Sequence, residues 1–340
     1  MKSKSSSTSH FITRRQAFSA AGSLLVAGAA GLRALGSAKT AARVPDDPPP
    51  GTEEPDAGQK LRVATCQFPV SASPRENAAY IQGFMHDAAR RGAHLVHTSE
   101  ASLTGYPEHD IASFNGYDWN ALRGATAGLR TLARELNLWL ALGSSHYLDA
   151  ETKPTNCIYL IDPTGAIVNR YDKCFCTSGD QAHYSAGNRL VTHDIRGVKI
   201  GLAICYDVAW PQLYIAYREL GATVMIHSFY NAHDTGPNCL DVLDRRLSPA
   251  RCSDNRMWAV CNNSSRPVSH WGTFIARPDG TIPKELAANV PGMLVHDFPD
   301  TLSANGWYHN FKPMGKRDDE IMTWGTPSDH PRQIDAQCEP

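Results

Sequence analysis

The feature that most constrains this chain is a strand–helix–strand unit that starts near residue 61. Residues 61–67 form a short apolar run, which suits a buried strand. The sequence Ser73-Pro74-Arg75-Glu76 is typical of a capping box with Pro74 at the first helical position, and Gly92 ends the helix. Residues 94–98 form the second strand. Two strands joined by a helix pair in parallel through a right-handed crossover, so the sequence predicts an α/β fold.

The alternation of strands and helices continues beyond this unit. Further strands are predicted at 138–142, 199–204, 222–227, 257–262 and 292–296, and further helices at 122–136, 211–220 and 240–255. Turn sequences at 162–165 and 277–280 indicate two hairpins, which pair 156–161 with 166–170 and 271–276 with 281–282. Residues 107–119 form an irregular loop at one wall of the site. No break in composition occurs between residues 61 and 298, so we expect one domain with two mixed sheets and outer helices.

The two ends of the chain differ from this central part. Residues 1–38 contain Arg14-Arg15, a small-residue apolar stretch and Gly36-Ser37-Ala38, a pattern that predicts a twin-arginine export signal. We therefore expect an exported, periplasmic protein. Residues 39–60, which are rich in Asp and Pro, are predicted to be a disordered linker, and residues 300–340 a polar C-terminal arm. The folded domain then comprises residues 61–299.

The charge balance excludes one class of partner. Lys and Arg number 33 and Asp and Glu number 34, which gives a formal net charge of −1. Because there is no excess of basic side chains to neutralise phosphates, the sequence argues against nucleic-acid binding. The central part contains no apolar run long enough to span a bilayer, so no membrane partner is expected for the mature protein.

Cys205 stands apart from the other cysteines, of which the chain has 9 in all. It follows an apolar run, and Pro211 then begins a helix, so the thiol lies in a strand-to-helix turn where a helix N-terminus favours a thiolate. A buried structural cysteine is the alternative. Folding in the cytoplasm before export would keep the thiol reduced. Cys174, Cys176 and His183 have the residue types of a metal site, but no second Cys pair matches them, so no metal is predicted.

Glu100 and Lys173 also fall at or just beyond predicted strand ends. A thiol nucleophile needs a base, and a carboxylate in an apolar pocket can have its pKa raised enough to take that proton and return it. A lysine ammonium can hold the carboxylate and stabilise an oxyanion. Together with Cys205, these groups suit acyl transfer through a thioester. Glu and Lys are more often solvated surface charges, so their chemistry alone leaves the assignment open.

Three segments resemble the signature motifs of the nitrilase superfamily, the carbon–nitrogen hydrolases: residues 99–107, Tyr171-Asp172-Lys173 and Ile204-Cys205-Tyr206-Asp207. Their order and spacing match too. The resemblance implies an α/β fold of the αββα sandwich type that pairs across a dimer face, so a homodimer or higher homo-oligomer is expected. It also implies Glu100 as base, Lys173 as oxyanion stabiliser, Cys205 as nucleophile and the Tyr206 N–H as second oxyanion donor, with no metal or organic cofactor.

The sequence departs from the family pattern in one place. Many members carry a second Glu shortly after the lysine, but residues 179–187 contain none. Asp180 could take its place with a shorter reach, or Gln181 could replace the charge with an amide. Further candidates for the pocket lining, each with a purely structural role as the equal alternative, are Tyr184, His227 and Tyr230.

These observations predict a thiol-dependent hydrolase that cleaves a non-peptide C–N bond of a small amide or N-carbamoyl compound. Cys-Tyr-Asp at 205–207 favours this activity over a nitrilase, which tends to carry Cys-Trp-Glu there. A catalytically silent binding protein on the same fold is supported only by the missing second Glu. A papain-like protease with His227 or His270 as the partner of Cys205 would lack the local cysteine signature of that family.

Overall fold

The computed structural model of the protein describes residues 60–232 and 239–298. The predicted export signal at 1–38, nearly all of the linker at 39–60 and the C-terminal arm at 300–340 lie outside these described residues, so they stay predictions. Within the described part, none of the helices combines the length and the hydrophobicity needed to cross a bilayer.

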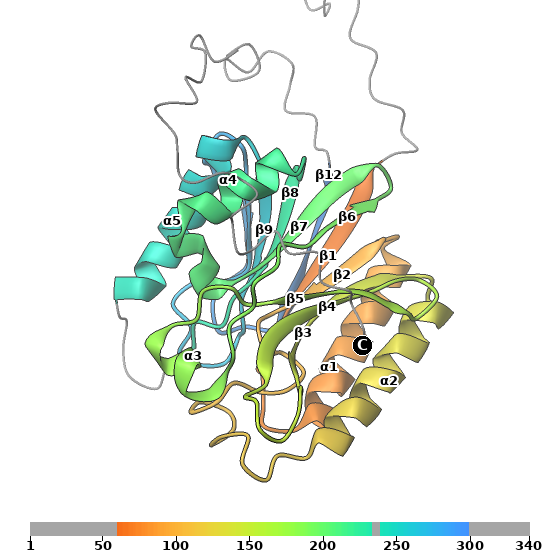
Figure 1. Ribbon diagram of the computed structural model, residues 1–340. Coiled ribbons are helices and arrows are strands. Elements are labelled where there is room, and N and C mark those ends of the chain that lie inside the picture. The colour runs from red at the N-terminus through yellow and green to blue at the C-terminus, as the bar shows by residue number, and fades with distance from the viewer. Residues whose placement is uncertain (1–59, 233–238, 299–340) are drawn as a thin grey trace, which may run out of the picture. The chain divides into compact units, whose positions relative to one another are not determined.

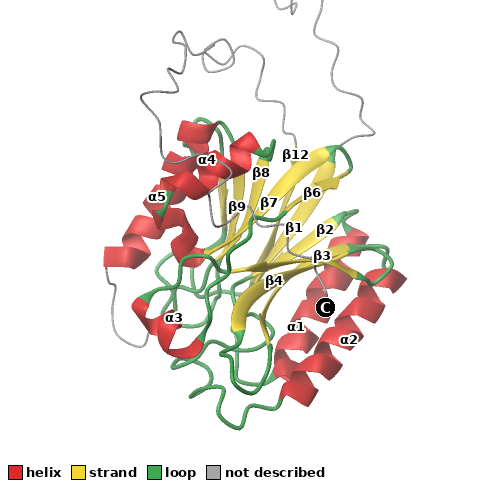
Figure 2. Ribbon diagram, in the orientation of Figure 1, coloured by secondary structure: helices red, strands yellow, loops and turns green. Residues whose placement is uncertain are grey.

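The first of two sheets contains the strand–helix–strand unit that the sequence predicts (Figure 1). Its strand order is β12-β1-β2-β3-β4-β5, in which β1, β2 and β3 are parallel and the other neighbours are antiparallel. The strands are β1 (Leu61–Gln67), β2 (Leu95–Thr98), β3 (Trp139–His146), β4 (Thr155–Ile161), β5 (Ile167–Asp172) and β12 (Gly292–Phe298). Two helices, α1 (Pro74–Arg90) and α2 (Trp119–Glu135), lie side by side on its outer face (Figure 2).

The second sheet has the order β11-β10-β9-β8-β7-β6, with β7, β8 and β9 parallel. Its strands are β6 (Thr192–Ile195), β7 (Val198–Ile204), β8 (Val224–Ser228), β9 (Trp258–Asn262), β10 (Phe274–Ala276) and β11 (Lys284–Glu285). The helices α4 (Pro211–Glu219) and α5 (Cys239–Asn255) cover its outer face (Figure 2). The chain leaves the first sheet after β5, passes through α3 (Ser178–His183), builds the second sheet and returns as β12 to the edge beside β1.

Alternating residues of the first sheet pack into two different apolar layers. Val63 and Ile158 face the second sheet, whereas their neighbours Ala64 and Cys157 face α1 and α2. A strand covered on both faces has apolar residues at nearly every position, which is why these strands read as continuous apolar runs. Each fully buried aliphatic side chain stabilises the fold by about 1.5–3 kcal/mol. The resulting αββα layers confirm the predicted fold class.

Some local predictions differ from the structure. The partner strand of β10 is Lys284–Glu285 rather than 281–282, because Thr281 closes the turn by accepting the Arg277 N–H. At the start of α1, Ser73 accepts from the Glu76 N–H as expected, but the Glu76 carboxylate accepts from Ser71 instead of completing the capping box.

Two short elements of the structure, β6 and α3, were not predicted from the sequence, and β8 differs at its end. Strand β6 joins β7 through Arg196 and Gly197, which both have positive φ, and Arg-Gly is a weaker hairpin signal than Asn-Gly. Helix α3 spans only six residues, too few for a hydrophobic period to emerge. Strand β8 ends at Ser228, one residue later than predicted, so His227 is its penultimate residue.

The fold brings the three motif residues to one edge. Glu100 comes shortly after β2, Lys173 directly after β5 and Cys205 directly after β7. β5 runs in the same direction as β3, since each is antiparallel to β4. The carboxyl ends of such strands are where open α/β sheets place ligand sites.

Candidate active site

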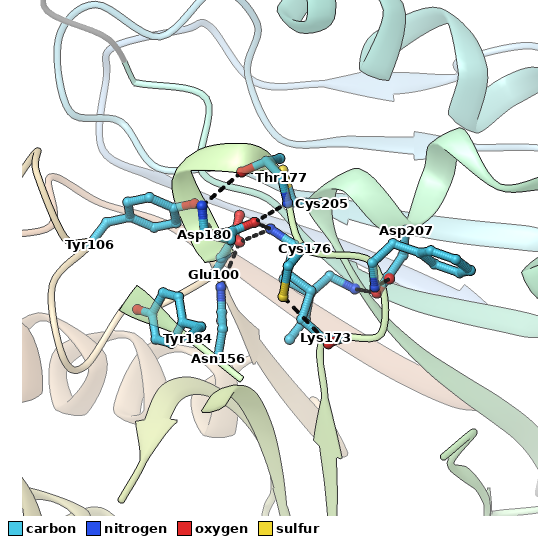
Figure 3. Close-up of polar contacts among 12 residues, drawn as sticks. Glu100, Tyr106, Asn156, Lys173, Cys176, Thr177, Asp180, Tyr184, Cys205 and Asp207 are labelled. Carbon is cyan, nitrogen blue, oxygen red and sulfur yellow. Dashed lines mark hydrogen bonds and ion pairs between the residues drawn. The ribbon is translucent and has the colours of Figure 1, made fainter. Parts of the chain in front are cut away.

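A buried ion-pair centre lies at this edge (Figure 3). The Nζ atom of Lys173 is 2.7 Å from Oε1 of Glu100 and 2.7 Å from Oδ2 of Asp180. All three side chains are fully buried. Asn156, in β4, donates its Nδ2–H to the same Oε1 of Glu100 at 2.8 Å. An ammonium held between two carboxylates is fixed in position and stays charged.

Close backbone contacts fix the segments that carry Glu100 and Lys173. A Cβ atom at Gly143 would lie 1.8 Å from the Ser99 carbonyl oxygen, so only glycine lets β3 approach the Glu100 loop. Similarly, a Cβ at Gly187 would lie 2.2 Å from the Asp172 carbonyl oxygen, and the Gly187 N–H donates to the Lys173 carbonyl at 2.8 Å. These two glycines therefore permit the packing that aims both charged side chains at each other.

Helix α3 determines which of the two candidate residues, Asp180 or Gln181, faces Lys173. Thr177 caps the helix, and Oδ2 of Asp180 accepts the Thr177 N–H at 2.9 Å while Tyr106 donates its hydroxyl to Oδ1. Asp180 thus points inward to Lys173. The side chain of Gln181 is exposed and donates to the Cys176 carbonyl at 3.3 Å. Of the two, the structure places only Asp180 at the ammonium.

The charges of this centre shift the proton affinities of its members. Burial, assisted by the negative charge of Asp180, raises the pKa of Glu100 to about 7 even though Lys173 acts in the opposite direction. Burial alone would lower the pKa of Lys173, but the charges of Glu100 and Asp180 outweigh it and raise that pKa. Burial opposes ionisation of Asp180 as well, yet Lys173 and the hydrogen bonds from Tyr106 and Thr177 hold its pKa below the usual value.

The centre retains hydrogen-bonding capacity for a ligand. Oε2 of Glu100 is buried and has no hydrogen-bond partner among the described residues. An ammonium has three N–H donors, and the two carboxylates take two of those of Lys173. Leaving a buried carboxylate oxygen without a hydrogen bond costs free energy. The unpaired Oε2 of Glu100 therefore marks a position where a ligand can donate a hydrogen bond. The centre can therefore accept a proton at Glu100 and donate a hydrogen bond from Lys173.

Cys205 occupies a sharp turn held by its neighbours. It is 9 % exposed, and its φ of 44° lies in the left-handed region, which a non-glycine residue adopts at a cost. It opens a short 3₁₀ helix, Cys205–Ala209, that leads into α4. Oδ2 of Asp207 accepts the Ile204 N–H at 2.9 Å, which ties the end of β7 to the turn.

Asp207 also joins this turn to the segment that carries Lys173. Tyr171 donates its hydroxyl to Oδ2 of Asp207 at 2.7 Å, and the Phe175 N–H donates to Oδ1 at 2.9 Å. Burial raises the pKa of Asp207 to about 6, although these hydrogen bonds act to lower it. The nucleophile candidate and the ammonium are thus held on one hydrogen-bonded unit.

His227 lies beneath the turn. Its side chain is fully buried, Nδ1 is 2.7 Å from the Tyr214 hydroxyl and Nε2 is 3.2 Å from the carbonyl oxygen of Cys205. Both ring nitrogens are therefore occupied by protein groups, and the geometry does not support a direct contact between His227 and a substrate. Arg251 of α5 holds the same turn from outside, through a 3.1 Å hydrogen bond to the Val208 carbonyl.

Comparison with known proteins now identifies the family. The sequence profile of the carbon-nitrogen hydrolase family matches residues 62–304, most of the chain. This protein belongs to the carbon-nitrogen hydrolase family. It is therefore an amidase-family enzyme, as its relatives and structural neighbours also indicate.

Individual relatives of this carbon-nitrogen hydrolase are distant. Deaminated glutathione amidase of Bos taurus is 28 % identical over 240 residues, which cover 63 % of this chain and 72 % of the relative. Omega-amidase NIT2 of Homo sapiens is 25 % identical, over 64 % of this chain and 84 % of that protein. Among solved structures, an amidase from Nesterenkonia sp. superposes with a TM-score of 0.63 at 24 % identity, over 72 % of this chain and 92 % of that one, which shows a shared fold.

An aromatic wall stands next to the charge-bearing residues of this carbon-nitrogen hydrolase. The rings of Tyr106 and Tyr230 stack with centroids 4.8 Å apart, and Tyr184 meets Tyr106 edge-on at 6.4 Å. Tyr184 shares a hydrogen bond with Ser145, and Tyr230 donates to Asp110 at 2.8 Å. These contacts place the predicted Tyr184 and Tyr230 beside the site, in the wall that holds Tyr106 over Asp180.

Two contacts at the site were not predicted from the sequence: that of Asn156 with Glu100 and that of the Tyr171 hydroxyl with Asp207. Asn156 is a polar residue in an otherwise apolar run, which is the signal that could have singled it out. Tyr171 belongs to a recognised motif, but nothing local indicates that its hydroxyl reaches Asp207 across 36 positions of sequence. Both contacts join segments that are distant in sequence: β4 to the segment after β2, and β5 to the turn after β7.

Burial raises the thiol pKa of several other cysteines, Cys66, Cys157, Cys176 and Cys252. The seven cysteines whose side chains the structure describes are all free thiols. Burial raises the pKa of the Cys176 thiol to about 12, and the thiols of Cys174 and Cys176 point to backbone carbonyls. Among the side chains that the structure describes, no group of three or more His, Cys, Asp or Glu residues is arranged to hold a metal ion.

Proposed function

We propose that this enzyme hydrolyses a non-peptide C–N bond of a small amide or N-carbamoyl compound through a thioester on Cys205. The observation that carries the proposal is the buried Glu100, with a pKa near 7 and a free Oε2, on the ammonium of Lys173. A carboxyl group with this proton affinity can both accept and donate a proton at neutral pH.

In the acylation step, Glu100 takes the proton of the Cys205 thiol and the sulfur attacks the carbonyl carbon. The carbonyl electrons move onto oxygen, where the free N–H of Lys173 and the backbone N–H of Tyr206 stabilise the negative charge. When the C=O bond re-forms, the C–N bond breaks and Glu100 returns its proton to the leaving nitrogen. Ammonia or an amine departs, and the acyl group stays on sulfur.

In the deacylation step, Glu100 takes a proton from water, and the hydroxide oxygen attacks the thioester carbon. The same two donors hold the second oxyanion. Collapse of this intermediate breaks the C–S bond, and the sulfur recovers its proton from Glu100. The acid product leaves and the enzyme returns to its starting state.

Asp180 is proposed to take the role of the second carboxylate. Its contact with Lys173 keeps the ammonium charged and positioned, and its negative charge raises the pKa of Glu100. Asp180 therefore acts through Lys173 and Glu100. Gln181, whose side chain is exposed, is not assigned a role.

Support for an amide as substrate comes from the relatives. The named relatives are amidases, and structures of the Nesterenkonia amidase contain butyramide, or the acetamide moiety of fluoroacetamide bound covalently to the active-site cysteine. A nitrile is the alternative substrate. A papain-like mechanism with His227 as the partner of Cys205 is disfavoured, because one ring nitrogen of His227 contacts the carbonyl oxygen of Cys205 and the other contacts the Tyr214 hydroxyl.

The test is turnover of a panel of short acyl amides, ω-amides and N-carbamoyl amino acids, with ammonia release as the readout. Cys205→Ala should abolish turnover and the covalent acyl adduct seen by mass spectrometry. Cys176→Ala, which removes a neighbouring half-buried thiol, is the matched control and should keep both. Retained amide turnover in Cys205→Ala would refute the proposal. If the wild type hydrolysed nitriles but none of the amides, the nitrilase alternative would take its place.

We also propose that the protein is exported, on the basis of Arg14-Arg15 and the apolar stretch that follows. Replacing both arginines with lysine should leave the protein in the cytoplasmic fraction. Unchanged periplasmic recovery of that variant would show that these arginines are not an export signal.

A further inference from the structure

We propose that His227 is a positioning residue that orients the oxyanion-binding N–H of Tyr206 by holding the carbonyl oxygen of Cys205. This inference rests on the proposed function, because it assigns Tyr206 to the oxyanion site. His227 itself does not touch the substrate. It acts through the peptide group that joins Cys205 to Tyr206.

The hydrogen bonds of His227 fix its tautomer. A carbonyl oxygen can only accept, so the 3.2 Å contact requires a proton on Nε2 that is donated to Cys205. Nδ1 is then the acceptor, and the Tyr214 hydroxyl donates to it at 2.7 Å. Burial lowers the pKa of His227 to about 3, which keeps the ring neutral and preserves this directional chain.

Peptide geometry carries the effect from the carbonyl to the oxyanion site. The C=O of Cys205 and the N–H of Tyr206 belong to one planar unit, and in a trans peptide they point in opposite directions. Holding the carbonyl oxygen against His227 therefore directs the Tyr206 N–H away from the β8 side of the turn. A donor fixed before the reaction stabilises an oxyanion better than one that must reorient.

The turn needs such a hold because of its backbone conformation. At a φ of 44°, Cys205 lies in the left-handed region, which an ordinary residue adopts only at a cost in free energy. Asp207 anchors the Ala203–Ile204 peptide through the Ile204 N–H, and His227 anchors the Cys205–Tyr206 peptide. The chain is therefore held on both sides of Cys205, which keeps the nucleophile in one orientation.

The position of His227 follows from the register of the second sheet. In the parallel pair β7–β8, Ala203 lies opposite His227 and Ile204 opposite Ser228, so His227 sits next to the end of β7. Its ring stacks on Phe229 with centroids 4.2 Å apart. The imidazole is therefore clamped between fixed elements and can act as a rigid support.

The test separates the oxyanion site from the thiol. Alkylation of Cys205 by iodoacetamide is a substitution at a saturated carbon, so it needs the thiolate but no oxyanion donor, whereas amide hydrolysis needs both. Removing an oxyanion donor outright costs about 10²–10³ in kcat, so a donor that is only misoriented in His227→Phe should cost about tenfold to a hundredfold. We expect this loss in kcat with little change in KM and with the alkylation rate retained.

Two further variants control for structural damage. His227→Gln keeps an N–H donor near the position of Nε2 and should recover part of the lost turnover. His97→Gln removes another fully buried imidazole, which contacts Thr65 and Ser228 rather than the turn, and should leave the ratio of turnover to alkylation as in the wild type.

Three results would overturn the inference. The first is wild-type turnover in His227→Phe, and the second is a loss of alkylation in that variant that equals its loss of turnover. The third is a His227 ring that carries its proton on Nδ1 in ¹⁵N spectra of histidine-labelled wild-type protein. The spectra decide the matter even if His227→Phe fails to fold or if the wild type cleaves no amide. Failure of the wild type to cleave any amide would count against the proposed function and not by itself against the tautomer.

Discussion

Glu100, Lys173 and Asp180 form the charge centre of the site, whereas Ile204, Cys205 and Tyr206 form its nucleophile turn. In the charge centre, the contacts that fix the side chains are ion pairs of 2.7 Å between fully buried groups. In the nucleophile turn, the contacts are hydrogen bonds to backbone groups, from the Ile204 N–H to Asp207 and from His227 to the Cys205 carbonyl.

This difference separates two tasks of the enzyme. Buried charges set proton affinities, because each neighbouring charge changes the cost of ionising Glu100. Hydrogen bonds to the backbone set direction, because they fix peptide planes and with them the thiol and the oxyanion donor. We therefore expect changes in the charge centre to alter pH dependence, and changes around the nucleophile turn to alter rates at every pH.

The largest effect is expected from Lys173→Met, in the charge centre. The variant loses an oxyanion donor and leaves Glu100 buried beside Asp180, so the pKa of Glu100 rises and its protonated form cannot act as base. We expect kcat/KM at neutral pH to fall about a thousandfold, as measured by ammonia release. Lys153→Met, which removes an exposed lysine bonded to the Gln181 carbonyl, is the matched control. Turnover of Lys173→Met within a few-fold of the control would refute the assignment.

An intermediate effect is expected from Asp207→Asn, at the joint between the two regions. The Asp207 carboxylate accepts hydrogen bonds from the Ile204 N–H, the Tyr171 hydroxyl and the Phe175 N–H. In the variant, an amide NH₂ group replaces one carboxylate oxygen and meets one of these donors, so a hydrogen bond is lost. We expect thermal unfolding to show a loss of about 1–3 kcal/mol, the penalty for an unsatisfied buried donor. The acidic limb of the pH profile should stay where it is while kcat falls about tenfold, since orientation is lost but Glu100 is untouched. A shifted limb would mean that the two regions are not separable.

The smallest effect on rate is expected from Asp180→Asn, which should mainly move the pH profile. As pH falls through about 7, Glu100 takes up a proton and can no longer accept one from the thiol, so kcat/KM decreases on the acidic side. Removing the negative charge of Asp180 lowers the pKa of Glu100, and we expect the acidic limb to move down by about one pH unit. Asp194→Asn, an exposed change in β6, should leave the limb in place. A limb that moves upward would contradict the electrostatic role given to Asp180.

Much of the fold could be read from the sequence. The apolar run before Cys205, the cap of α1 and both turn sequences depend on local preferences, so β7, α1 and the hairpin of β4 and β5 appeared at or near their observed positions. The short elements β6 and α3 were not predicted, because they contain too few residues to show a hydrophobic periodicity. The identities of Glu100, Lys173 and Cys205 followed from their motifs and from the rule that strands in such folds end at the site.

The choice between Asp180 and Gln181 needed the tertiary structure. The two residues are adjacent in sequence, and on a helix with 3.6 residues per turn they point about 100° apart. Only the docking of α3 against the Lys173 segment and Tyr106 decides which one faces inward. The same holds for His227, whose contact with Cys205 depends on the register of β7 and β8.

The sequence by itself determined the α/β class, most of the strands along the chain and the candidate reactive groups, because these depend on residue types and local spacing. The tertiary structure decided which groups meet. Asn156 reaches Glu100 across 56 positions, Asp207 binds Tyr171 across 36, and the burial of Glu100 sets its pKa near 7. Such properties arise from contacts between distant segments and from the exclusion of water around them, and no local pattern of residues encodes either one.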